Sequence, residues 1–127
     1  MGLAGSDCSS MRLEDLARSI DAHLILPSGS GNPDIVSVFA GATMSDLMAN
    51  AAPGTLLVTS LNNPQLIRVA DLMDVPGICL VDGCVPSEKL VSRARAAGTA
   101  LLISPAGLQD TRTRAARFIS AESRRMS

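Results

Sequence analysis

The amino-acid sequence predicts a single α/β domain whose mainly parallel sheet has about five strands, with helices packed on its faces. First, short aliphatic runs alternate along the chain with amphipathic stretches of helical spacing, the order that βαβ crossovers produce. Second, residues 56–64 and 78–86 share a strand, a polar turn, a proline and a helix start at an offset of 22 residues. Third, the predicted strands are continuously apolar, as expected when both faces of a sheet are covered.

The first predicted element is a helix over residues 11–22. Its apolar side chains follow the spacing of one helix face, at Leu13, Leu16, Ala17 and Ile20. A short strand is expected at residues 23–27. Residues 28–33 (SGSGNP) are then a loop, because nearly every residue in them favours a turn.

The next pair of elements is a strand at residues 34–40 and a short helix that reaches residue 52. Thr43 or Ser45 is the expected N-cap, since a hydroxyl at that position accepts a hydrogen bond from the first turn. Pro53-Gly54 ends the helix, and a buried strand follows at residues 55–60.

Asn63 and the proline after it predict the start of a helix over residues 64–75, because proline is favoured at the first helical position. A further strand is expected at residues 77–82. It leads to a helix over residues 86–97, which Gly98 terminates.

The last predicted strand covers residues 100–104, as a shortened third copy of the repeated pattern. Asp110 is the expected N-cap of a final helix over residues 111–123. The repeated order of strand and helix therefore extends to the end of the domain.

Residues 1–10 are expected to be a flexible N-terminal tail, and residues 11–127 the domain. The tail lacks the basic and apolar segments of a secretory signal, and no run in the chain approaches the ~18 apolar residues of a membrane helix. The three cysteines are too few, and odd in number, for an extracellular disulfide framework. We therefore expect a cytoplasmic protein that does not contact a membrane.

The composition excludes several classes of function. With 2% aromatic residues and neither Trp nor Tyr, the chain cannot stack bases, so nucleic acid is not an expected partner. The glycines of residues 29–31 belong to neither a P-loop nor a complete GxGxxG motif. His23 is the only histidine, and Cys79 and Cys84 lack zinc spacing, so we expect no metal and no cofactor.

We expect no catalytic residues either. Nucleophilic catalysis would need His23, and a histidine at the start of a strand is more often bonded to the backbone than used as a base. An enzyme that uses Cys84 or His23 is the least favoured alternative. Two carboxylate pairs are expected only to keep helix surfaces solvated, namely Glu14 with Asp15 and Asp71 with Asp74.

Charge is distributed unevenly along the chain, although the net charge is only −1. Residues 1–110 carry 6 basic and 11 acidic groups, whereas residues 111–127 carry five arginines and one glutamate. The basic segment could bind a phosphate or an acidic partner. Alternatively it is a solvated helix face, with Arg124 and Arg125 near a helix C-terminus where cations are favourable.

A cluster of polar residues and glycines follows the predicted parallel strands. Ligands of open parallel sheets bind outside the carboxyl ends of the strands, where loops and helix N-termini meet. Groups of this kind can orient a neutral or phosphorylated small molecule, or can simply cap helices and shape turns. The candidate ligand-binding residues are Gly41, Thr43, Ser45, Thr59, Ser60, Asn62, Asn63, Asp82, Gly83 and Ser104.

The stretch from Val36 to Ile119 resembles the DRTGG domain, in particular its short stand-alone members. The matching residues are Gly41-Ala42, Ser45 to Ala49, Pro53 to Thr59, Ala70 to Leu72, Gly77 to Gly83 with Pro86, Ala94 to Gly98, Leu101-Leu102 and Asp110-Thr111. The sequence departs from the family at its eponymous residues. Leu61-Asn62-Asn63 stands near the family's Asp-Arg, and Val81-Asp82-Gly83 replaces its Thr-Gly-Gly.

The resemblance implies a fold like the N-terminal domain of HPr kinase/phosphorylase and a non-catalytic role. DRTGG domains occur fused to CBS-domain proteins, phosphotransacetylases and pyrophosphatases. We therefore expect a regulatory or small-molecule-sensing domain that acts as a free-standing homo-oligomer, namely a homodimer. The expected ligand is a nucleotide or a phosphorylated small molecule. The alternative is a structural module that docks a partner protein through its helices or basic C-terminal segment, without a small-molecule ligand.

Overall fold

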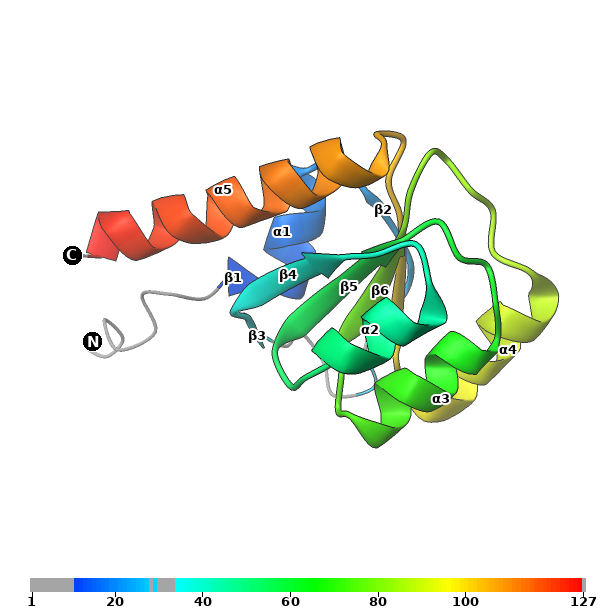
Figure 1. The fold of residues 1–127 in the computed structure, drawn as a ribbon. Helices are drawn as coiled ribbons and strands as arrows, with labels where there is room; N and C mark the ends of the chain where they lie inside the picture. Colours follow the sequence, from blue (N-terminus) through cyan, green and yellow to red (C-terminus); the bar gives the residue numbers. More distant parts are fainter. Residues whose placement is uncertain (1–10, 28, 30–33, 127) are drawn as a thin grey trace.

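The central sheet of the molecule has five strands in the order β2-β7-β6-β5-β4 (Figure 1). The computed structural model describes residues 11–27, 29 and 34–126. The strands are β2 (His23–Leu26), β4 (Ser37–Ala40), β5 (Thr55–Thr59), β6 (Gly77–Leu80) and β7 (Ala100–Ile103). Strands β4 to β7 are parallel, and β2 pairs with β7 in the antiparallel direction. The predicted α/β domain with a mainly parallel sheet is confirmed.

Helices cover both faces of this sheet (Figure 1). On one face lie α1 (Leu13–Ser19) and α5 (Leu108–Met126). On the other lie α2 (Met44–Asn50), α3 (Gln65–Leu72) and α4 (Glu88–Ala97). In the part of the chain that the structure describes, no helix combines the length and apolarity that crossing a membrane requires.

The central strands supply the core on both faces. Every residue of β5 and of β6 is buried. Because side chains alternate along a strand, Leu56 and Val58 pack in the core under α1 and α5, while Leu57 packs in the core under α2, α3 and α4. Two-sided burial explains the continuous apolar runs. The edge strand β2, by contrast, alternates exposed and half-buried residues.

Three helix ends follow the signals in the sequence, although α2 and α3 end at Asn50 and Leu72, before the predicted residues 52 and 75. Of the two N-cap candidates for α2 it is Thr43 that caps, since its Oγ1 accepts a hydrogen bond from the N–H of Asp46 at 3.2 Å. Asn63 acts as expected before α3, where its Oδ1 accepts from the N–H of Gln65 at 2.9 Å. Gly98 ends α4 with a φ of 75°, a left-handed conformation that glycine adopts without strain.

The N-terminal region differs from its predicted form. Met11–Arg12 is a short strand, β1, which pairs antiparallel with β3 (Asp34–Ile35), so α1 begins only at Leu13. Helix α1 also ends at Ser19 instead of residue 22. The chain turns there because Asp21 adopts a φ of 59°. The tail predicted at residues 1–10, and most of the loop predicted at 28–33, lie outside the described residues.

Two further predicted boundaries are corrected. The strand predicted at residues 34–40 is divided at Val36, because the N–H groups of Val36 and Ser37 both donate to the carbonyl of Gly54, at 2.8 and 3.3 Å. The final helix starts at Leu108, so the prediction that Asp110 caps it is wrong. Asp110 lies in the first turn of α5, where the helix dipole favours an acidic side chain.

Cys79 lies in the middle of the sheet, in β6, and is fully buried. Burial raises the pKa of its thiol from 9.0 to about 12, because desolvation disfavours the thiolate. Its Sγ donates a weak hydrogen bond to the carbonyl of Leu80 at 3.8 Å. Cys84, after the end of β6, is only half-buried. The two thiols therefore differ in access to solvent.

We predict that Leu57→Ala lowers the free energy of unfolding by about 3 kcal/mol, because it opens a cavity in a fully buried position. The matched control is Leu72→Ala on α3, where the leucine is 77% exposed and the change should stay within about 0.5 kcal/mol. Urea unfolding of the two variants measures both values. Equal losses in the two variants would contradict the placement of Leu57 in the core.

We predict that a thiol reagent labels Cys84 in the native protein and Cys79 only after unfolding. Because the folded pKa of Cys79 lies above its unfolded value, the neutral thiol stabilises the fold fully below about pH 9 and progressively less as the pH rises toward 12. A Cys8→Ser/Cys84→Ser variant leaves Cys79 as the only thiol, and mass spectrometry follows its labelling. Rapid native labelling of that variant would refute the prediction.

Candidate functional site

The carboxyl ends of β4, β5, β6 and β7 lie at one edge of the sheet, as their parallel pairing requires. Each strand leads there into the helix that follows it, α2, α3, α4 or α5 in turn (Figure 1). The structure thus brings the ten candidate residues of the sequence to one edge, spread over four neighbouring loops. Their side chains have different surroundings, however, and most of their polar atoms are already bonded.

Asn62 ties two of the loops together. Its Nδ2 donates to the carbonyl of Val85 at 2.9 Å, and its Oδ1 accepts from the N–H of Ser87 at 3.0 Å. Ser87 in turn caps α4, since its Oγ accepts from the N–H of Leu90 at 3.2 Å. The amide of Asn62 thus joins the start of α3 to the start of α4.

Asp82 and Gly83 form a tight turn after β6. Both have positive φ, 58° and 65°, and the N–H of Cys84 donates to the carbonyl of Val81 at 3.0 Å, which defines a type I′ turn. The N–H of Asp82 donates to Ala106 and that of Gly83 to Ser104, at 2.8 and 2.9 Å. All three N–H groups of the turn are used within the protein. The Asp-Gly pair is a sequence signal for this turn that the sequence reasoning above missed.

Ser104 and Thr59 have structural contacts and are fully buried. The Oγ of Ser104 lies 2.8 Å from the Oγ1 of Thr111 and accepts from the N–H of Ala106 at 3.2 Å. The Oγ1 of Thr59 accepts from the N–H of Leu61 at 3.0 Å. Both hydroxyls therefore hold the loops in shape.

Gly41 is also buried, directly after β4, and its N–H donates to the carbonyl of Val58 at 3.0 Å. A Cβ at this position would lie only 2.9 Å from Cε2 of Phe39. Glycine is needed here so that Phe39 can pack against the backbone at the start of α2.

Three of the candidate side chains remain available. Ser45, Ser60 and Asp82 are exposed, and none of the three makes a side-chain hydrogen bond within the described ranges. Ser60 and Asp82 follow the neighbouring strands β5 and β6, whose pairing continues through the bond from the N–H of Val81 to the carbonyl of Thr59 at 3.2 Å. This pair can accept hydrogen bonds from hydroxyl or amino groups of a ligand.

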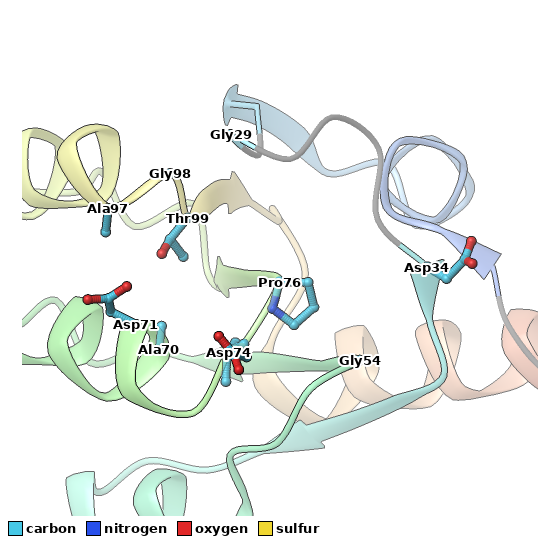
Figure 2. Close-up of a pocket in the computed structure, with 11 residues that line it drawn as sticks. Gly29, Asp34, Gly54, Ala70, Asp71, Asp74, Pro76, Ala97, Gly98 and Thr99 are labelled. Carbon is cyan, nitrogen blue, oxygen red and sulfur yellow. The ribbon is translucent and has the colours of Figure 1, made fainter.

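A hollow lies at the opposite edge of the sheet, before the amino ends of β5, β6 and β7 (Figure 2). Its volume is about 440 Å³. Asp71 and Asp74, which the sequence suggested were merely solvated, line it together with Thr99. The sequence reasoning missed this cavity, because its walls come from separate segments and its only signal was the spacing of the two carboxylates.

His23 and Cys84, the candidates for catalysis, come from strands that are not neighbours in the sheet. His23 is exposed at the start of β2, while Cys84 follows β6, and β7 lies between these two strands. Among the residues whose positions are described, no group of three or more His, Cys, Asp or Glu side chains is placed to hold a metal ion. Cys79 is fully buried in the core.

Comparisons with known proteins show which known fold this chain resembles. No family model matches the sequence, and no curated protein matches it. Among solved structures the chain is similar to the CBS and DRTGG domains of the regulatory region of Clostridium perfringens pyrophosphatase, complexed with activator, diadenosine tetraphosphate. The TM-score is 0.64 at 12% identity, over 82% of this chain and 45% of that one. This chain thus spans less than half of that structure, and the likeness confirms a DRTGG-like fold.

Proposed function

We propose that this chain is a regulatory domain that senses a small molecule and has no catalytic activity of its own. The observation that carries the proposal is the fold shared with a pyrophosphatase regulatory region that was solved with a nucleotide activator. We place its action in the cytoplasm, as a homo-oligomer.

A nucleotide is the ligand class we infer, bound at the carboxyl edge of the sheet. The Asp82 carboxylate accepts hydrogen bonds only, so it suits the hydroxyls of a ribose or the amino group of a base. Ser60, on the next loop, can donate or accept. Four helices begin at this edge, and the positive ends of their dipoles favour the phosphates.

Leu61-Asn62-Asn63 stands near the position of the Asp-Arg pair in the DRTGG pattern that the chain resembles. Asn62 carries no charge, and both ends of its amide are engaged with Val85 and Ser87. The N–H groups of the Asp82-Gly83 turn are likewise engaged. We therefore infer that the nucleoside part of the ligand provides most of the recognition, and that phosphates add a weaker contribution.

One observation favours the alternative, a module that docks a partner protein. Helix α5 has 19 residues, and its C-terminal half extends past the edge of the sheet beyond β4 (Figure 1). Phe118 in this helix is 36% exposed. A helix that projects in this way offers a surface to which a partner protein can bind without a small-molecule ligand.

We predict that an adenine nucleotide stabilises the protein against heat. At 100 times its dissociation constant a ligand adds about 2.7 kcal/mol, which corresponds to a rise in Tm of roughly 10 °C for a domain of this size. Thermal unfolding in the presence of AMP, ATP or diadenosine tetraphosphate measures this rise in Tm. Asp82→Asn should reduce the rise, because it removes the acceptor charge and still tolerates a positive φ.

The matched control is Asp21→Asn, since Asp21 is exposed and has almost the same φ, 59°, outside the proposed site. It should leave the nucleotide effect unchanged. No rise in Tm with any of the three nucleotides would refute nucleotide sensing and favour the docking alternative.

We predict that the protein is a dimer in solution. Light scattering should give the mass of two chains, and Arg124→Ser/Arg125→Ser should leave both that mass and the nucleotide effect unaltered. A monomer at every concentration would contradict the oligomer proposal. If the double variant alone dissociates, the basic C-terminal segment contributes to the contact between copies.

A further inference from the structure

The cavity at the amino edge of the sheet is built as a polar rim over an apolar floor (Figure 2). Ala70, Val75, Pro76 and Ala97 supply apolar surface from the ends of α3 and α4. One wall is fixed by backbone contact, because the N–H of Gly29 donates to the carbonyl of Gly98 at 2.8 Å. A hollow of about 440 Å³ with such walls has room for a small organic molecule.

The charge of this cavity is negative. Asp71 and Asp74 line it, both are exposed, and neither forms an ion pair within the described ranges. Helices α3 and α4 end at this edge, so the negative ends of their dipoles add to the carboxylates.

The nearest counter-charges lie outside the cavity. Its third carboxylate, Asp34, has a partner, since one oxygen lies 3.9 Å from the Nε of Arg12 and the side chain points away from the other two (Figure 2). Arg68 and Arg93 line the neighbouring groove between α3 and α4, which Asp71 also lines, but neither arginine forms a salt bridge with Asp71 within the described ranges. No basic side chain is among the described residues that line the cavity itself. The cavity therefore favours a cation.

Thr99 is a second, independent indication of a ligand. The residue is only 4% exposed, and its hydroxyl has no hydrogen-bond partner within the described ranges. The oxygen of this hydroxyl is itself accessible, since among the described residues no buried side-chain oxygen or nitrogen lacks a partner. Thr99 lines the cavity, and Figure 2 shows its oxygen on the side of α3, toward Asp71. A hydroxyl that makes no hydrogen bond within the described residues thus faces the same space as an unpaired carboxylate.

We propose that this cavity binds a small aliphatic diamine. One ammonium donates to the Asp71 carboxylate and the Thr99 hydroxyl, the methylene chain lies on the apolar floor, and the second ammonium approaches Asp74. A divalent metal fits less well, because no group of three or more His, Cys, Asp or Glu side chains among the described residues is placed to hold one. The site lies at the edge opposite the proposed nucleotide site and goes beyond that function.

The test is a titration of the full chain with putrescine, followed by the amide NMR shifts of Asp71, Gly98 and Thr99. We expect saturable shifts at these residues. Butylamine, which has one ammonium and resembles a lysine side chain, should bind more weakly, and the uncharged butanediol and Mg²⁺ should not reproduce the effect. Equal binding of butylamine would assign the site to a single ammonium and refute the diamine.

Three variants test the contacts. Asp71→Asn and Asp74→Asn should each raise the dissociation constant of putrescine roughly fivefold, as expected for one exposed ion pair. Thr99→Val should also weaken binding, because it removes the acceptor and keeps the side-chain shape. Asp21→Asn is the control for Asp74→Asn, since the two aspartates have φ values of 59° and 56°. Asp21→Asn should leave the dissociation constant of putrescine unchanged.

The two proposals can fail separately. Asp82→Asn should leave putrescine binding unchanged, and Asp74→Asn should leave the nucleotide effect unchanged. The diamine proposal is overturned if putrescine gives no saturable shifts, if Mg²⁺ or butanediol shifts the same amides equally, or if Asp21→Asn weakens binding as much as Asp74→Asn does.

Discussion

The parallel pairing of β4, β5, β6 and β7 is the constraint on which the rest of this molecule depends. Parallel neighbours must be joined by crossovers, and the crossover helices cover the sheet and bury both of its faces. All four strands then point their carboxyl ends to one edge, and α2, α3 and α4 return in the opposite direction. The two edges consequently differ in polarity, with helix starts at one and helix ends at the other.

The two proposed sites lie at these two edges and differ in chemistry accordingly. The carboxyl edge gathers helix N-termini and a turn whose N–H groups already bond to neighbouring loops, so its unused chemistry is mainly that of Ser60 and the Asp82 carboxylate. The amino edge gathers helix C-termini, two unpaired carboxylates and the Thr99 hydroxyl. Asn62 stiffens the first edge, because its amide bonds to Val85 and Ser87 and so ties two of the loops together.

Local signals predicted much of the fold, because they act within a few residues. The apolar runs of β5 and β6, the Thr43 and Asn63 caps and the Gly98 terminator all lie where the sequence indicated. The pairing of Met11–Arg12 with Asp34–Ile35 was not predictable, since neither two-residue strand has a pattern of its own. The cavity was missed for a similar reason: Asp71 and Thr99 come from different crossovers and meet only through the tertiary structure.

The register shift between Leu24 and Leu26 makes the two outer strands of the sheet unequal. An irregular strand presents misaligned N–H and C=O groups, which hinders the addition of a strand from another molecule. Strand β4, at the other side, pairs with β5 in regular register from Ser37 to Ala40. For the addition of a strand from another molecule, β4 is therefore better matched than β2.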